Sequence, residues 1–159
     1  MSGAATTVRV LALLPTREDQ ASLNEIFWHS NWNLHFVEGL GQARVMIDEL
    51  APGVVISDCR LPDACWQDVL CELQRRELEP QLIVASRLAD EGLWDEVLNL
   101  GGYDVLATPF QAQEVVRSIS FAWRLWREKF RTGARAPARV KVAGAACGLS
   151  SAQPMLILG

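Results

Sequence analysis

The chain has 159 residues, of which 50% are hydrophobic and 21% are charged, and its formal net charge is −4. From Arg131 onward there are four basic residues and no acidic one, so the first 130 residues hold 11 basic and 19 acidic residues, a net charge of −8. Such an acidic body lacks the basic surface that binds nucleic acid, and the length suits one domain with a tail.

Short apolar runs alternate with longer helical patterns through the first 130 residues. The runs predict buried strands at residues 8–14, 33–37, 54–58, 81–85 and 103–107. The patterns that follow them predict helices at residues 16–29, 42–50, 66–76, 89–100 and 111–130. Beyond residue 130 Ala, Gly, Arg and Pro dominate until a short apolar run at residues 155–158. We therefore predict a domain at residues 7–130 and a linker or tail at residues 131–159.

Five strands, each followed by a helix, predict an α/β fold in which helices cover both faces of a doubly wound parallel sheet. Right-handed crossover connections favour the flavodoxin-like (βα)5 arrangement with strand order 2-1-3-4-5. Ligands bind such sheets at the carboxyl ends of the strands. The candidate site residues are therefore those at the strand ends: Leu14, Pro15, Asp58, Ser86, Thr108 and Pro109.

The cysteines and the N-terminus indicate a soluble, cytoplasmic protein. The four cysteines form no CxxC pair and have no histidine nearby, which argues against a zinc site and suits a reducing compartment. The first ten residues lack the basic start and apolar run of a signal peptide. No stretch approaches the roughly 20 apolar residues that a membrane span requires, so we expect no membrane contact.

Two short motifs stand at the ends of predicted strands. VVISDCRLPD, residues 54–63, contains Asp58, and ATPF, residues 107–110, places Thr108 fifty residues further along. At these spacings the chain resembles a response-regulator receiver domain of two-component signalling, similar to the chemotaxis regulators, over roughly residues 7–128. The resemblance implies that Asp58 accepts a phosphoryl group from a histidine kinase and that Ser86 is the switch hydroxyl. It also implies a cis peptide bond between Thr108 and Pro109.

The same resemblance implies residues that this chain lacks. In receivers, two acids after the first strand help the phospho-acceptor to hold Mg²⁺, but these positions are Leu14 and Pro15 here. The lysine that pairs with the phosphoryl group is replaced by Thr108, and the switch aromatic by Val105. Asp58 alone would remain as a metal ligand, so we expect Mg²⁺ binding to be weak or absent.

Several of these residues have a second interpretation. Glu18 and Asp19 could replace the lost acids if the loop were shifted, but we favour their role in a first helical turn, where negative charge complements the helix dipole. An aspartate before a Leu-Pro-Asp turn, such as Asp58, can also cap backbone amides. Ser86 fits an ordinary turn or N-cap residue as well as a switch hydroxyl.

The last predicted helix carries an apolar stripe that suggests an interaction face. Trp123 can face the sheet, whereas Trp126 and Phe130 continue the stripe beyond the predicted end of the sheet. We expect a homodimer through the last two helices. The alternatives are that residues 155–158 cover the stripe, or that the helix frays after Leu125.

Three functions are consistent with these patterns. The first is a phosphorylated receiver domain, and the second is a pseudo-receiver that acts as a protein-interaction or dimerisation module without phosphorylation. The third, a flavodoxin-like enzyme or nucleotide binder, lacks support, because residues 14–17 (LPTR) stand where a glycine-rich phosphate loop would lie and no nucleophile–base pair is visible. We therefore predict a non-enzymatic protein whose partner is a histidine kinase or another signalling protein.

Overall fold

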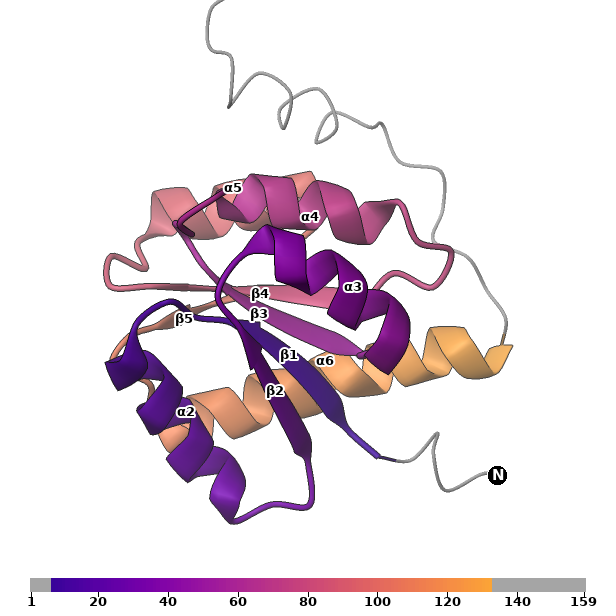
Figure 1. The fold of residues 1–159 in the computed structure, drawn as a ribbon, viewed down its shortest axis with the longest axis horizontal. Helices are drawn as coiled ribbons and strands as arrows, with labels where there is room; N and C mark the ends of the chain where they lie inside the picture. Colours follow the sequence, from indigo (N-terminus) through magenta and orange to yellow (C-terminus); the bar gives the residue numbers. More distant parts are fainter. Residues whose placement is uncertain (1–6, 133–159) are drawn as a thin grey trace, which may run out of the picture.

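The computed structural model describes residues 7–132, which form one parallel sheet and the helices that cover it. The strands are β1 (Arg9–Leu13), β2 (Asn33–Val37), β3 (Val54–Asp58), β4 (Gln81–Ser86) and β5 (Asp104–Ala107). All neighbouring strands are parallel, and their order is β2-β1-β3-β4-β5 (Figure 1). The predicted flavodoxin-like fold is therefore confirmed.

The helices of residues 7–132 divide between the two faces of this sheet. They are α2 (Arg17–Trp28), α3 (Leu40–Leu50), α4 (Trp66–Gln74), α5 (Glu91–Leu100) and α6 (Ala112–Thr132). Helices α2 and α6 lie on one face, and α3, α4 and α5 lie on the other (Figure 1). Two of them end in left-handed backbone, α3 at Ala51 with φ 49° and α5 at Gly101 with φ 114°.

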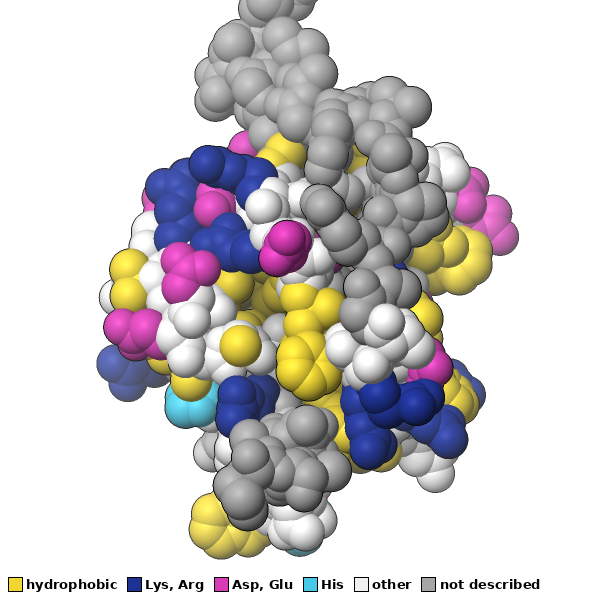
Figure 2. Space-filling view, turned by 90° about the vertical axis from the view of Figure 1, so that its right-hand side faces the viewer, with side chains coloured by type: hydrophobic (Ala, Val, Ile, Leu, Met, Phe, Trp, Pro, Cys, Tyr) yellow, Lys and Arg dark blue, Asp and Glu magenta, His cyan; other side chains and the backbone are white. Residues whose placement is uncertain are grey.

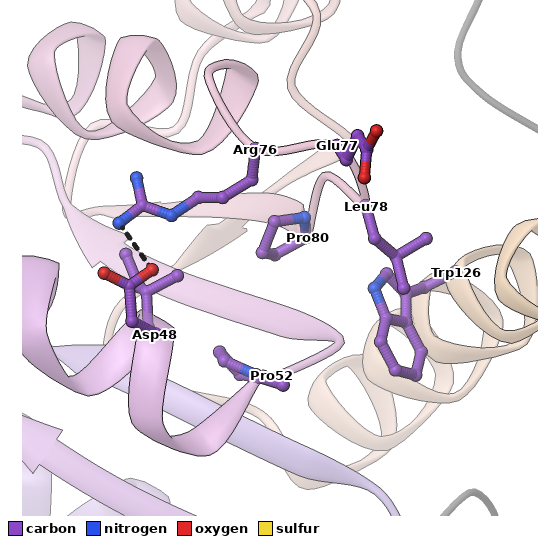
Figure 3. Close-up of a pocket in the computed structure, with 9 residues that line it drawn as sticks. Asp48, Pro52, Arg76, Glu77, Leu78, Pro80 and Trp126 are labelled. Atoms are coloured by element: carbon purple, nitrogen blue, oxygen red, sulfur yellow. Dashed lines mark hydrogen bonds and ion pairs between the residues drawn. The ribbon is translucent and has the colours of Figure 1, made fainter.

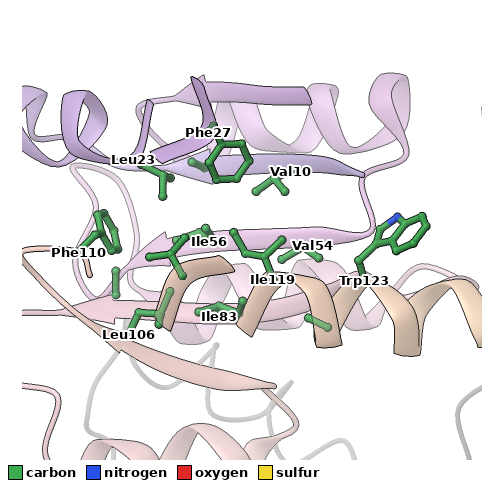
Figure 4. Packing of buried hydrophobic residues seen from close by; sticks show 14 of the residues in the cluster. Val10, Leu23, Phe27, Val54, Ile56, Ile83, Leu106, Phe110, Ile119 and Trp123 are labelled. Atoms are coloured by element: carbon green, nitrogen blue, oxygen red, sulfur yellow. The ribbon is translucent and has the colours of Figure 1, made fainter. Parts of the chain in front are cut away.

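Two apolar layers hold the helices to the sheet, and β3 shows how. Its residues 54–57 are all buried, and successive side chains point to opposite faces. Val54 and Ile56 pack in the layer that contains Ile119 of α6 (Figure 4), whereas Val55 belongs to the layer beneath α3, α4 and α5. Burial on both faces explains why the strands appear in the sequence as continuous apolar runs.

The C-terminal half of α6 corrects the predicted interaction face. Trp123 and Trp126 are only 8% and 9% exposed, so Trp126 does not extend the stripe beyond the sheet. The reason is Gly53, where an added Cβ atom would lie 2.8 Å from Cε3 of Trp126, so that the missing side chain lets the helix approach the start of β3. Trp126 also lines a hollow of about 220 Å³ beside Leu78 (Figure 3). Phe130, in contrast, is 50% exposed and stacks on Trp126 with ring centroids 5.5 Å apart.

Helix α6 continues to Thr132, which excludes fraying after Leu125. At the end of the molecule where α6 ends, apolar side chains gather between groups of basic side chains (Figure 2). Residues 131 and 132, predicted as the start of the tail, belong to α6 instead. The rest of the predicted tail, from residue 133 onward, lies outside the described residues, and so do residues 155–158, the predicted cover of the stripe. No helix within residues 7–132 combines the length and the apolar character needed to cross a membrane.

Candidate functional site

The carboxyl ends of the strands bring the predicted site residues to one edge of the sheet, where α2 also begins (Figure 1). Asp58 lies opposite Ala85 in the sheet register, and Ser86 lies opposite Ala107, the residue before Thr108. The backbone N–H of Thr108 donates to the carbonyl of Ser86 at 3.0 Å, which holds the end of β5 against β4. The loops after β3, β4 and β5 therefore meet beside Asp58.

The Asp58 side chain is half-buried, and the surrounding protein engages its carboxylate only weakly. Within residues 7–132 its Oδ1 accepts a single hydrogen bond, from the backbone N–H of Arg60 at 3.4 Å, which is long for such a bond. The hydroxyl of the buried Ser57 donates to the carbonyl of Asp58, not to its carboxylate. Capping of backbone amides is thus a minor role for Asp58, whose carboxylate keeps free acceptor capacity.

Ser86 and Cys59 form a polar contact next to Asp58. The hydroxyl of Ser86 accepts a hydrogen bond from the backbone N–H of Leu88 at 3.1 Å, as expected for a turn residue. Burial raises the pKa of the Cys59 thiol, and a hydrogen bond with Ser86 offsets part of that rise. Sequence reasoning did not assign Cys59 to the site, although its position directly after Asp58 was an available signal.

Asp19 is a buried acid at the same edge. It is 7% exposed, whereas its neighbour Glu18 is exposed. Burial raises the pKa of the Asp19 carboxyl, the charge of Asp58 raises it further, and the charge of Arg87 lowers it in part. Asp19 is therefore within electrostatic range of both Asp58 and Arg87. Complementing the helix dipole, the role favoured from sequence, accounts for the exposed Glu18 but not for the burial of Asp19.

The positions of the lost acid pair do not provide a metal site. The side chain of Leu14 is fully buried in the apolar layer, and that of Pro15 has no atom that could bind a metal ion. The backbone carbonyl of Leu14 already accepts a hydrogen bond from Nε2 of Gln20 at 2.5 Å. Within residues 7–132, no group of three His, Cys, Asp or Glu side chains could hold a metal ion. Asp19 and Asp58 supply two carboxylates instead of the three that the resemblance implies. The residues present do not fit a receiver-type Mg²⁺ site.

Two further positions set the charge of this edge. Thr108, at the position of the expected lysine, is uncharged, and its peptide bond to Pro109 is cis, which confirms that prediction. Arg87 directly follows Ser86, is exposed, and makes no ion pair with any other described residue. Sequence reasoning missed Arg87, and the signal that could have found it is a basic residue directly after the candidate switch hydroxyl.

Comparison with known proteins relates parts of the chain to chemotaxis regulators. No protein-family model matches the chain. The chemotaxis protein CheY of Listeria monocytogenes is 24% identical over 75 residues, and CheY of Thermotoga maritima is 26% identical over 72 residues. These matches cover 47% and 45% of this chain, and 63% and 60% of the relatives. The matched part therefore spans less than two thirds of either relative.

Solved structures share the whole arrangement of strands and helices. The signal receiver domain of a Luxo repressor protein from Vibrio parahaemolyticus has a TM-score of 0.73 at 20% identity, covering 79% of this chain and 97% of that one. CheY4 of Vibrio cholerae has a TM-score of 0.66 at 13% identity, covering 74% and 99%. The chain has the fold of a response-regulator receiver domain. Its receiver fold places Asp58, Ser86 and Thr108 at the carboxyl edge, as the resemblance implied.

The charges of this receiver fold are arranged differently from those that the resemblance implies. The second acid comes from the first turn of α2, at Asp19, rather than from the two positions after β1. The arginines nearest Asp58 are Arg87 after β4 and Arg60 after β3, whereas the position of the expected lysine after β5 is Thr108. Both the acidic and the basic residues of this edge therefore differ from those that the resemblance implies.

Proposed function

We propose that this receiver domain works in two-component signalling and that Asp58 accepts a phosphoryl group from a histidine kinase. The observation that supports the proposal is the carboxylate of Asp58, which ends β3 at the carboxyl edge and accepts one long hydrogen bond. A buried carboxylate with a purely structural role would accept shorter bonds from several donors. Ser86, at the neighbouring strand end, offers a hydroxyl that could donate to a phosphoryl oxygen.

Phosphorylation of the full chain by a small acyl phosphate tests this function. The chain is incubated with acetyl phosphate, in parallel with Mg²⁺ and with EDTA, and its intact mass is measured. We expect a gain of one phosphoryl group in the wild type and none in Asp58→Asn. An equal gain in both proteins would place the modification elsewhere, and no gain in the wild type under either condition would reject phosphorylation at Asp58.

The remaining parts of the proposal follow from the sequence. We assign the signalling domain to residues 7–130 and a linker or tail to residues 131–159. The domain is proposed to act as a non-enzymatic, cytoplasmic module that contacts signalling proteins. Nucleic acid is not a proposed partner of this domain, because its first 130 residues carry a net charge of −8.

The alternative function is a phosphorylation-independent interaction module, and an exposed apolar face supports it. Trp94 of α5 is 46% exposed, and Phe121 and Leu125 of α6 are 49% and 41% exposed. Between these helices, Asp104 of β5 accepts hydrogen bonds from Nε1 of Trp94 at 3.3 Å and from the hydroxyl of Ser118 at 2.7 Å. These bonds tie both helices to the edge strand. A homodimer through this face would not depend on a switch aromatic.

Sedimentation equilibrium tests the proposed homodimer. We expect the wild type to dimerise and the double variant Phe121→Glu, Leu125→Glu to be monomeric, since charge would enter an apolar contact. Val45→Glu is the matched control, because Val45 is 56% exposed on α3, which packs against β1 and β2, away from the β5 edge where α5 and α6 flank the sheet. A wild type that stays monomeric at all concentrations, with and without acetyl phosphate, would reject the dimer. A solved structure of similar fold is a dimer: the beryllofluoride-activated NtrC4 receiver domain. It has a TM-score of 0.68 to this chain at 20% identity and covers 74% of this chain.

A further inference from the structure

A phosphoryl group on Asp58 would bring further negative charge to an edge that already holds the buried carboxyl of Asp19. Receivers are expected to offset this charge with a divalent cation and a lysine. The donor set here does not fit the cation, and the lysine position is Thr108. A different positive group is needed to compensate, because unbalanced charge in a partly buried site is strongly unfavourable.

Few cationic side chains are placed to reach this edge. Arg17 opens α2 but lines a groove with Asn24 and Phe36, on the side of α2 that faces β2. Arg60 also lies at this edge, since it follows Asp58 closely and its charge acts on the Cys59 thiol. Arg87 is the stronger candidate, because it follows Ser86 at the neighbouring strand end and its charge acts on the buried Asp19.

The register places Arg87 within reach of Asp58. Asp58 is opposite Ala85, and Arg87 is two residues further along. Arg87 lies in the turn directly after β4, and neighbouring strands are about 4.8 Å apart, so the Cα atoms of Asp58 and Arg87 are on the order of 10 Å apart. A long arginine side chain covers a distance of that order. Because the charges of Arg87 and Asp58 both act on Asp19, these three groups share one electrostatic neighbourhood.

Arg87 is also free to rearrange. Its side chain is exposed and forms no ion pair with another residue of the described range 7–132. A guanidinium presents N–H groups in a planar fork that matches two phosphoryl oxygens, and it stays charged at all physiological pH values. It can therefore replace a charge-neutralising metal ion without a set of carboxylate ligands.

We propose that Arg87 takes over the charge-neutralising role of the metal ion and the lysine, so that Asp58 is phosphorylated without a divalent cation. The proposal rests on the proposed phosphorylation of Asp58. In the step, a carboxylate oxygen of Asp58 forms a bond to phosphorus of an acyl phosphate. The bond between phosphorus and the acyl oxygen of the donor breaks, and the donor's carboxylate (acetate, for acetyl phosphate) leaves with the electron pair of that bond. Arg87 donates hydrogen bonds to two phosphoryl oxygens during and after the transfer.

The test compares acetyl phosphate labelling in EDTA and in Mg²⁺ for the wild type and three variants. We expect the wild type to be labelled in EDTA at a rate within about threefold of that in Mg²⁺, and Arg87→Ala to be at least about tenfold slower in both. Arg87→Lys should lie between them, because it keeps the charge but loses the fork. Arg60→Ala, the control for a nearby exposed arginine, should match the wild type. Labelling of the wild type that requires Mg²⁺, or an unchanged rate in Arg87→Ala, would overturn the proposal.

A second measurement tests the placement of Arg87 without any phosphorylation. Because the guanidinium holds the pKa of Asp19 lower than burial and Asp58 alone would, Arg87→Ala should raise the pKa of Asp19 in an NMR titration. Arg60→Ala should leave it unchanged. An unchanged value in Arg87→Ala would overturn the placement and with it the proposal. If the wild type is not labelled in any buffer but the NMR titration gives the expected result, phosphorylation at Asp58 is rejected. Only the placement of Arg87 near Asp19 is then supported.

Discussion

Two groups of charged side chains in this domain are engaged in opposite ways. Between α3 and α4, Glu72 is 7% exposed and accepts hydrogen bonds from Arg44 at 3.0 Å and from Arg76 at 2.7 Å. Arg76 also donates to Asp48 of α3 at 3.1 Å (Figure 3). These short bonds connect the two helices. At the carboxyl edge, the carboxylate of Asp58 accepts one long hydrogen bond, and Arg87 has no ion-pair partner within residues 7–132.

The pKa values of two buried carboxyl groups differ in the same way between the ion-paired region and the carboxyl edge. Burial alone would raise the pKa of Glu72, but hydrogen bonds from Arg76 and Arg44 bring it below its ordinary value. The pKa of Asp19 is raised instead, since the effects of burial and of the charge of Asp58 outweigh the opposite effect of Arg87. A carboxylate that is paired on folding stabilises the fold, whereas one that is buried without close partners costs stability and remains available for another role.

Removing Glu72 should break the paired region. Glu72→Gln leaves Arg76 and Arg44 without their shared carboxylate, and we expect the free energy of unfolding to fall by about 2–4 kcal/mol. Urea unfolding followed by tryptophan fluorescence measures it. The control is Glu77→Gln, an exposed neighbour that should change stability by less than about 0.5 kcal/mol. A loss below about 1 kcal/mol for Glu72→Gln would mean that the network contributes little to stability.

Asp63 links the loop after the site to α3, and its removal should have an intermediate effect. Its carboxylate accepts hydrogen bonds from the backbone N–H groups of Leu40 at 2.9 Å and Gly41 at 3.1 Å, and so caps a helix whose own N-cap residue is Gly39. Asp63→Ala should therefore lower the free energy of unfolding by about 1 kcal/mol at pH 7.

The effect of Asp63 should depend on pH. The hydrogen bond from Leu40, followed by that from Gly41, lowers the pKa of Asp63 below its ordinary value of 3.8. A lowered carboxyl pKa contributes stability above 3.8 that is lost as the pH falls through the folded value. Wild type and Asp63→Ala should therefore converge in acid, and a difference that is equal at pH 7 and pH 3 would contradict the cap.

Asp19→Asn should change stability in the opposite direction, and by less. Because the pKa of Asp19 is raised in the folded state, its charged form destabilises the fold above that pKa. The variant should gain about 0.5 kcal/mol at pH 7. The gain should vanish below the ordinary value of 3.8, where the carboxyl is protonated in both states. Chemical denaturation at several pH values measures it, with the exposed Glu18→Gln as the control. A loss of stability at pH 7 would show that Asp19 accepts structural bonds.

Asp58→Asn should have the smallest effect on stability. The carboxylate accepts one long hydrogen bond from Arg60, so we expect a change within about 0.5 kcal/mol, neutral or slightly stabilising. Urea unfolding of both proteins measures it. A loss of more than about 1 kcal/mol would mean that Asp58 belongs to the paired, structural group of charges after all.

The amino-acid sequence by itself determined the order of strands and helices and the residues at the strand ends. Apolar runs and helical patterns are local signals, so β3 and the helix after it could be predicted without knowing their neighbours. The position of Asp58 at the end of such a run is equally local, and the cis bond before Pro109 followed from the motif that resembles receivers. These features depend on a few adjacent residues.

The tertiary structure alone decided which side chains meet across these segments. Asp63 caps a helix that begins 23 residues earlier, and Trp126 is buried because Gly53, far away in the sequence, lacks a side chain. Asp19 is buried and within electrostatic range of Arg87 because the start of α2 and the end of β4 lie at the same edge of the sheet. No pattern within a single segment contains this information, since the contacts depend on how crossover connections bring distant strands together and on how closely the helices pack against them.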